Sequence, residues 1–286
     1  MDSGHGTQIV LSYRQAEEIL RARERGDAGL TVSTDLGLTT EPVKIGPAGA
    51  AFRDGITVSW DDIEMIAGED TKCFEATPEG VRSISVFSET TNWVRSLMPT
   101  SGAPTTLVGG FPMHRIKDTD PMADTREKVK ALRPVRGRVL DTATGLGYTA
   151  IEMAKYAEHV VTVELDPAAV EIARMNPWSK DLFTNLKIEL ITGDIGEIIH
   201  EFDDASFDRV LHDPPTLALA GELYSGDFYR QLHRVLARKG RLFHYIGDPE
   251  GRTGRRTTSG VVQRLQEAGF RRVDRRPQAY GVVAYR

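Results

Sequence analysis

Residues 138–150 read R-V-L-D-T-A-T-G-L-G-Y-T-A, and this stretch determines how the rest of the chain is interpreted. A short apolar run ends at Asp141, three small residues follow, and Gly145 and Gly147 precede residues that favour a helix. The order predicts a strand, a tight turn and a helix N-terminus. Glycines suit such a turn because its backbone takes conformations that side chains disfavour, and because a ligand can then lie against main-chain N–H groups.

Two classes of ligand use this geometry. Residues 145–150 fit the dinucleotide pattern G-x-G-x-x-G/A, which is a weak signal alone, and a glycine-rich turn without a ligand is also compatible with it. However, an acidic residue and three further residues separate the strand from the first glycine. This D-x-x-x-G-x-G turn resembles motif I of the class I S-adenosyl-L-methionine (SAM) methyltransferases. The resemblance implies that Asp141, Thr142, Gly145 and Gly147 bind the aminocarboxypropyl part of SAM.

Strands and helices alternate after residue 138, which predicts an α/β fold with a doubly wound, mostly parallel, seven-stranded sheet. The last two strands are expected to form a hairpin at the sheet edge. The predicted strands after the first are residues 160–164, 186–191, 207–211, 241–246, 271–275 and 279–285, and the predicted helices are 167–175, 228–237 and 258–268.

The front part of the chain has a different pattern, with short β-branched segments separated by Gly, Pro and Asp-Gly. We predict an N-terminal α+β module over residues 1–104, an irregular linker over 105–124 and the SAM-binding domain over 125–286. In the linker, His114 is a candidate substrate contact, although a packed joint between domains explains it equally well. The module's predicted helices are 13–26, 60–66 and 88–98, and its predicted strands are 31–34, 42–45, 55–59, 72–76 and 81–86.

Acidic residues follow the second and third predicted strands. Glu164 lies 17 residues beyond Gly147, a spacing that places a carboxylate beside the first turn, where its two oxygens can accept both hydroxyls of a ribose. Asp194 and Ile195 follow the third strand. The family resemblance implies that Asp194 accepts the adenine amino group and that Ile195 packs on the adenine ring.

The fourth predicted strand ends in L-H-D-P-P-T, residues 211–216. In a parallel sheet of this kind, substrate lies over the carboxyl ends of the fourth and fifth strands, so Asp213 is expected to face the transferred group. The turn resembles the D/N-P-P-Y/F/W motif of amino-group methyltransferases, which implies catalytic roles for Asp213 and the Pro214 carbonyl. Thr216 stands where those enzymes carry an aromatic residue, which argues against a flipped base as the acceptor. Strand alternation directs His212 into the sheet packing.

The fifth strand leads into further candidate substrate contacts, namely Tyr245, Asp248 and Arg255. Arg255 belongs to a basic loop over residues 250–256, which suits a phosphate or carboxylate substrate but also suits an ordinary solvated loop. Residues 234–286 hold 13 basic and 4 acidic side chains, whereas residues 1–120 hold 11 basic and 18 acidic ones. A basic surface suits RNA, but arginine-rich helices and strand edges also serve solubility.

The overall composition is that of an ordinary globular protein, with 40% hydrophobic and 27% charged residues. No apolar run has the roughly 20 residues of a membrane helix, and residues 1–10 do not resemble a signal peptide, so we expect a cytoplasmic protein without membrane contact. Cys73 is the single cysteine, and the histidines show no ligand spacing. We therefore predict no disulfide and no metal.

Residues 138–286 as a whole resemble class I SAM methyltransferases, and the combination of a β-rich front module with a spermidine-synthase-like core resembles archaeal predicted methyltransferases. The resemblance implies SAM as the cofactor and methyl transfer to a nitrogen acceptor in RNA, a protein or a small amine. Aminopropyl transfer from decarboxylated SAM to a polyamine is one alternative. A catalytically silent SAM-fold protein that binds RNA or protein is another. Assembly as a homo-oligomer is left open.

Overall fold

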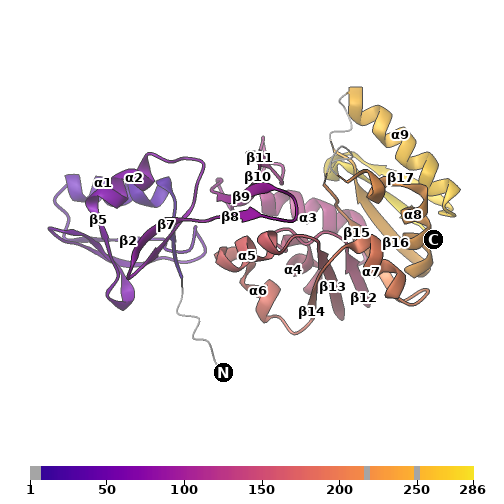
Figure 1. The fold of residues 1–286 in the computed structure, drawn as a ribbon, viewed down its shortest axis with the longest axis horizontal. Helices are drawn as coiled ribbons and strands as arrows, with labels where there is room; N and C mark the ends of the chain where they lie inside the picture. The colour runs from indigo at the N-terminus through magenta and orange to yellow at the C-terminus, as the bar shows by residue number, and fades with distance from the viewer. Residues whose placement is uncertain (1–7, 216–219, 248–251) are drawn as a thin grey trace. The chain divides into compact units, whose positions relative to one another are not determined.

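The computed structural model describes residues 8–215, 220–247 and 252–286. The chain divides into two compact units (Figure 1): Met1–Pro121 with Ala168–Lys180, and Met122–Pro167 with Asp181–Arg286. They are called the front unit and the rear unit below. Two predicted substrate residues, Thr216 and Asp248, lie outside the described residues, and of Arg255 only the backbone is described.

The rear unit contains a seven-stranded sheet in the order β14-β13-β12-β15-β16-β18-β17. Neighbours among the first five are parallel, whereas β18 runs antiparallel to both β16 and β17. The predicted α/β class and mostly parallel sheet are therefore confirmed. The strands are β12 (Arg138–Asp141), β13 (His159–Glu164), β14 (Ile188–Thr192), β15 (Phe207–His212), β16 (Leu236–Tyr245), β17 (Arg272–Arg276) and β18 (Gly281–Tyr285).

The strand order reverses beside β12, because β12 pairs with β13 on one side and with β15 on the other. In open α/β sheets, ligands bind at the carboxyl ends of the strands at such a reversal. The chain leaves β12 at Asp141 and leaves β15 at His212, so the glycine-rich turn and the D-P-P turn both lie at this point.

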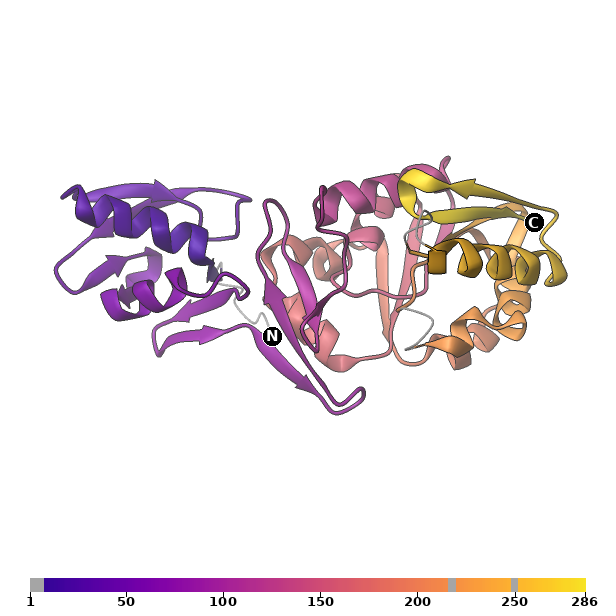
Figure 2. The same cartoon turned by 90° about the horizontal axis from the view of Figure 1, so that it is seen from above.

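The helices of the rear unit cover the sheet and contribute to its core. Helices α8 (Gly226–Val235) and α9 (Arg252–Glu267) pack against each other, with α8 on β16 and α9 on β17 and β18 (Figure 2). Burial of Phe228, Tyr229, Leu232 and Val235 on one face of α8 explains its position. The other helices that concern the site are α3 (Pro121–Leu132), α4 (Tyr148–Ala154), α6 (Lys180–Thr184) and α7 (Ile195–Ile198).

The boundary between α8 and β16 differs from the prediction. The predicted helix over 228–237 ends at Val235, and β16 begins directly at the buried Leu236. The strand contains a register irregularity opposite Phe207 to Arg209, and Lys239 adopts a φ of 65° there. The residues A-R-K-G at 237–240 look like a turn in the sequence, but the structure accommodates them as a bulge within one long strand.

Within residues 8–83, the front unit has two α-helices and two small antiparallel sheets around an apolar core. The predicted helices near residues 13 and 60 are confirmed as α1 (Tyr13–Glu24) and α2 (Trp60–Ala67). One sheet has the order β1-β6-β7 and the other β2-β3-β4-β5. Their strands are β1 (Ile9–Leu11), β2 (Gly29–Val32), β3 (Glu41–Ile45), β4 (Gly49–Ala51), β5 (Thr57–Ser59), β6 (Phe74–Thr77) and β7 (Gly80–Ser83).

A further sheet corrects two predictions. Residues 85–112 form the antiparallel sheet β11-β10-β9-β8, so the predicted helix over 88–98 is wrong, and the linker over 105–124 that was predicted to be irregular contains two strands. Ser88 accepts a hydrogen bond from the Thr91 N–H at 3.0 Å, and Asn92 has a φ of 57°, which together form a hairpin turn. The sheet continues across residue 104, and the predicted domain boundaries stay a prediction. The strands are β8 (Ser85–Ser88), β9 (Trp93–Met98), β10 (Thr105–Val108) and β11 (Phe111–Pro112).

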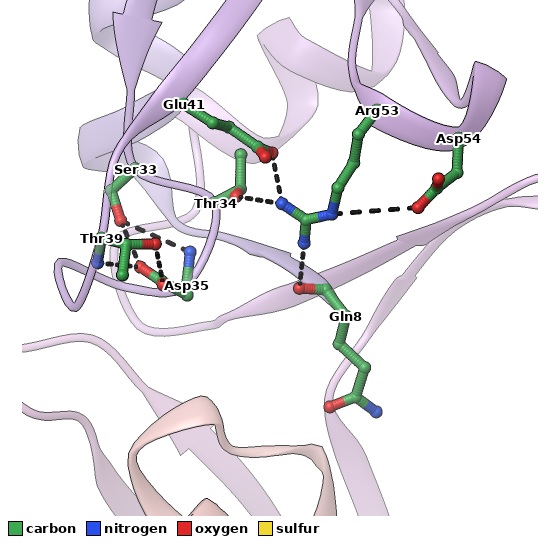
Figure 3. A network of polar contacts seen from close by, with 8 residues as sticks. All are labelled: Gln8, Ser33, Thr34, Asp35, Thr39, Glu41, Arg53 and Asp54. Carbon is green, nitrogen blue, oxygen red and sulfur yellow. Dashed lines mark hydrogen bonds and ion pairs between the residues drawn. The ribbon is translucent and has the colours of Figure 1, made fainter. Parts of the chain in front are cut away.

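A polar network joins distant segments of the front unit (Figure 3). The Arg53 guanidinium donates to Thr34 Oγ1 and to the Gln8 carbonyl, both at 2.9 Å, and forms an ion pair with Glu41 at 2.5 Å. Asp35 accepts hydrogen bonds from Ser33 Oγ at 2.9 Å and from the Thr39 N–H at 2.8 Å. Because the donors and acceptors of this network pair with each other, we infer that the network stabilises the front unit.

Among the described residues, no helix combines the length and the apolar character needed to cross a membrane.

Candidate active site

Asp141 ends β12 with a fully buried side chain. Its Oδ2 accepts hydrogen bonds from Thr149 Oγ1 at 2.8 Å and from Thr162 Oγ1 at 3.2 Å. Its Oδ1 is buried and has no hydrogen-bond partner in the described part of the chain. Burial raises the pKa of Asp141 to about 7, although the Thr149 hydroxyl counteracts this rise. A buried acceptor without a donor is costly, so Oδ1 is suited to a donor from a bound ligand.

The two glycines of the turn have different roles. Gly145 has a φ of +52°, and a Cβ atom added there would have no neighbour within 4 Å. Gly147 has a φ of +77° and is the N-cap of α4, and a Cβ there would lie 2.7 Å from a methyl carbon of Leu182. Gly145 therefore leaves open space beside the turn, whereas Gly147 is required for packing.

Glu164 holds the turn in place. Its Oε2 accepts the Gly145 N–H at 2.8 Å, and its Oε1 accepts the Asp166 N–H at 3.1 Å. Each carboxylate oxygen can accept a second hydrogen bond, so these contacts are compatible with the predicted binding of ribose hydroxyls, which stays a prediction.

The predicted adenine contacts lie at the start of α7. Asp194 is exposed and caps this helix, because its Oδ1 accepts the Gly196 N–H at 2.7 Å. Ile195 is 4% exposed and belongs to the hydrophobic core of the rear unit. Its side chain therefore offers little free surface for a ring, and the adenine contacts stay a prediction.

Asp213 follows β15 and forms an ion pair that the sequence analysis missed. The Lys128 ammonium, on α3, lies 2.6 Å from Asp213 Oδ2 and 2.8 Å from Asp124 Oδ2. The same ammonium lies 4.4 Å from the centre of the Tyr245 ring. Asp124 and Lys128 stand at i and i+4 on α3, which is also the spacing of an ordinary surface ion pair. The sequence pattern therefore does not mark these two side chains as buried.

The charges of this cluster depend on one another. Burial lowers the pKa of Lys128, but the nearby Asp213 and Asp124 outweigh that effect and raise it above its ordinary value. Burial raises the pKa of Asp213, and the Lys128 ammonium offsets part of that rise. Lys128 therefore stays charged and is no candidate for a general base or a nucleophile.

His212 has a single consistent tautomer. Its Nε2 lies 3.0 Å from the Leu223 carbonyl, which can only accept, so Nε2 carries the hydrogen. Its Nδ1 then accepts from Thr142 Oγ1 at 2.6 Å. Burial lowers the pKa of His212 to about 3, so the ring is neutral at physiological pH. The prediction that His212 points into the sheet packing is confirmed, since its side chain is fully buried.

The remaining predicted residues are distributed as follows. Pro214 is buried, and the carbonyl of the following Pro215 accepts a hydrogen bond from the Tyr224 hydroxyl at 3.0 Å, which fixes the D-P-P turn. Tyr245 lies over Lys128. His114 belongs to the front unit, where its Nδ1 is 2.9 Å from Thr105 Oγ1. Its contact with substrate stays a prediction.

The described residues contain no group of three or more His, Cys, Asp or Glu side chains arranged to hold a metal ion. The predicted absence of a metal stays a prediction.

Comparison with known proteins identifies the class of the rear unit. Residues 139–240 match a family model described as "Methyltransferase domain". A spermidine synthase from Thermotoga maritima has the same fold, with a TM-score of 0.56 and 18% identity over 72% of this chain and 74% of that one. A spermidine synthase in complex with the transition-state analogue AdoDATO gives a TM-score of 0.58 at 18% identity, over the same shares of each chain. Residues 139–240 therefore form a methyltransferase domain, and the rear unit has the Rossmann-like fold of these spermidine synthases.

The whole chain is 37% identical to "Uncharacterized protein MJ1233" of Methanocaldococcus jannaschii over 97% of this chain and 96% of that protein. The chain belongs to the same family as this archaeal protein. A segment of 123 residues is also 30% identical to "Polyamine aminopropyltransferase 2" of Streptomyces coelicolor, but this match covers 40% of the present chain and 22% of that protein.

The methyltransferase domain implies SAM as the cofactor, and the site fits this group. Gly145 leaves space beside the turn, and Asp141 Oδ1 is a buried acceptor without a partner in the described residues. Both features suit the amino acid end of SAM, which carries an ammonium donor and needs close approach to main-chain N–H groups.

Proposed function

We propose that the protein transfers a methyl group from SAM to a nitrogen atom of an acceptor. The observation that carries the proposal is the D-P-P turn at the end of β15, beside the strand that carries the glycine-rich turn. Asp213 is fixed there through Oδ2 by Lys128, its side chain is 21% exposed, and its Oδ1 has no hydrogen-bond donor among the described residues. An acceptor N–H group fits this oxygen.

SAM, when bound, supplies a methyl group activated by a sulfonium. Asp213 Oδ1 accepts an N–H of the acceptor and thereby directs the nitrogen lone pair, and the Pro214 carbonyl accepts a second N–H. The nitrogen forms the new N–C bond while the S–C bond breaks toward sulfur, and the proton that the nitrogen loses passes to Asp213 or to water. Positioning of this kind supplies much of the rate in such displacements.

Aminopropyl transfer is a second candidate, because the segment related to a polyamine aminopropyltransferase and the spermidine-synthase fold both favour it. A polyamine carries several positive charges and prefers a pocket with excess negative charge. At Asp213, the Lys128 ammonium compensates one of the carboxylates. This compensation reduces the excess negative charge that a polyamine would need, and we therefore place methyl transfer first.

Two experiments test the proposal. Calorimetric titration with SAM and with decarboxylated SAM asks which cofactor the glycine-rich turn holds, and tighter binding of the decarboxylated form would overturn methyl transfer. Transfer of a labelled methyl group from SAM to RNA, protein and small-amine fractions then asks for the acceptor. We expect Asp213→Ala to lower transfer by roughly 10²- to 10⁴-fold while SAM still binds. Asp227→Ala, at an exposed carboxylate on α8, is the matched control.

An Asp213→Ala protein that transfers methyl at the wild-type rate would exclude the role of the D-P-P turn. A wild-type protein that binds SAM and methylates none of these fractions would favour the catalytically silent SAM-fold protein instead.

A further inference from the structure

We infer that Lys128 is a positioning residue that keeps Asp213 ionised and its Oδ1 turned toward the acceptor, so that the site selects an uncharged nitrogen bearing an N–H. This inference rests on the proposed function of Asp213. Nothing in the motifs of the sequence assigns a role to Lys128.

The geometry directs Lys128 at Asp213 and away from substrate. An ammonium has three N–H donors. The ammonium donates a hydrogen bond to Asp213 Oδ2 at 2.6 Å and forms an ion pair with Asp124 Oδ2 at 2.8 Å, and the centre of the Tyr245 ring lies 4.4 Å away. The Lys128 side chain is 3% exposed. It therefore acts through Asp213 and is not itself a catalytic residue.

The ionisation of Asp213 depends on Lys128. Burial alone favours the protonated form of a carboxyl group, and a protonated Asp213 offers an O–H donor where the acceptor N–H needs an oxygen lone pair. The groups that act on the charge of Asp213 include one cation and several acids. These are Lys128 and Asp124 on α3, Tyr224 before α8, and Asp141 on β12.

The same arrangement discriminates between acceptors. A cationic amine at Oδ1 would place a second positive charge near the Lys128 ammonium. Like charges repel, and they do so more strongly in a protein site than in bulk water. An amide-like or aromatic amino group carries N–H donors without that charge. The lysine thus favours a weakly basic nitrogen over an alkylammonium ion.

The titration of Asp213 tests the inference without a known acceptor. We would label the aspartate side-chain carbonyls with ¹³C, assign Asp213 by its loss in Asp213→Asn, and follow its chemical shift against pH. We expect Lys128→Met to raise the Asp213 titration midpoint by roughly one to three pH units. We expect Asp124→Asn to lower the Asp213 midpoint, because Lys128 then pairs with Asp213 alone. An unchanged midpoint in Lys128→Met would overturn the inference.

Three further variants control for misfolding and for nonspecific effects. Lys128→Met leaves Asp124 buried without its cation, so the double variant Asp124→Asn, Lys128→Met serves where the single variant does not fold, and its Asp213 midpoint should also exceed that of Asp124→Asn. Lys128→Arg keeps the charge and should restore the wild-type midpoint. Lys130→Met, at an exposed lysine on the same helix, should leave it unchanged.

The pH profile of methyl transfer separates this inference from the proposed function. If Lys128 sets the ionisation of Asp213, the acidic limb of the profile moves to higher pH in Lys128→Met, by the same amount as the NMR midpoint. If the midpoint moves but Asp213→Ala transfers methyl normally, the proposed role of Asp213 in methyl transfer fails while the control of its ionisation stands. If Asp213→Ala is inactive but the midpoint and the profile stay in place, the inference fails and the proposed function stands.

Discussion

Two aspartates at neighbouring strand ends, Asp141 buried and Asp213 half-buried, are held by different interactions. Asp141, after β12, is held by the hydroxyls of Thr149 and Thr162, whereas Asp213, after β15, is held by the ammonium of Lys128. Hydroxyls satisfy a carboxylate without compensating its charge, and burial raises the pKa of Asp141 to about 7. An ammonium compensates the charge itself. The sheet thus places a carboxyl that titrates near neutrality beside the cofactor turn and a charge-paired one beside the predicted acceptor site.

Removal of the ammonium should have the largest effect on stability. Lys128→Met leaves Asp124, whose side chain is fully buried, and Asp213 without their cation. Breaking a buried ion pair from one side costs about 3 to 5 kcal/mol. We expect a loss of that size in the free energy of unfolding at pH 7, measured by chemical denaturation. The double variant Asp124→Asn, Lys128→Met should recover part of it. A single variant as stable as wild type would show that the pair contributes little.

The pH dependence of stability should report on Asp141. Its pKa lies at 3.8 ordinarily and at about 7 in the folded protein. Between these values the folded state binds the extra proton, so the contribution of Asp141 to stability decreases as pH rises from about 4 to about 7. Each unit of pKa corresponds to about 1.4 kcal/mol, which amounts to a few kcal/mol across this range.

We expect Asp141→Asn to remove this slope from denaturation curves recorded between pH 4 and pH 8 in the absence of cofactor. Asp194→Asn, at the exposed N-cap of α7, should leave the slope in place. A slope that persists in Asp141→Asn would assign it to another group.

Alanine substitutions at the two glycines of the cofactor turn should affect stability and SAM binding to different degrees. Alanine at either position has a left-handed backbone, which costs about 1 to 2 kcal/mol. Gly147→Ala adds a clash with Leu182, whose methyl carbon would lie 2.7 Å from the new Cβ, whereas Gly145→Ala meets no neighbour within 4 Å. We expect the larger stability loss for Gly147→Ala and the larger loss of SAM affinity, measured by calorimetry, for Gly145→Ala. The reverse order would mean that the open space beside Gly145 is not the cofactor site.

The sequence predicted the part of the site that local patterns encode. The strand-turn-helix at Asp141 and the D-P-P turn at Asp213 follow from residue order, and the parallel sheet follows from alternation along the chain. Lys128 could not be found in this way, because it comes from a helix 85 residues away from Asp213 and has the spacing of a surface ion pair. In the front unit, residues 88–98 were predicted as a helix. Cross-strand pairing with β8 and β10 determines their structure instead.

The smallest predicted effect concerns the hydroxyl that holds Asp141. Thr149→Val keeps the side-chain shape but removes the 2.8 Å hydrogen bond to Asp141 Oδ2. Hydrogen bonds to an ionised carboxylate are stronger than those to its protonated form, so the loss should be larger at pH 8 than at pH 5. We expect about 1 kcal/mol at pH 8, with Thr149→Ser close to wild type because it retains a donor. If the loss is equal at both pH values, Asp141 does not change its protonation between them, and the contrast with Asp213 would have to rest on the ion pair alone.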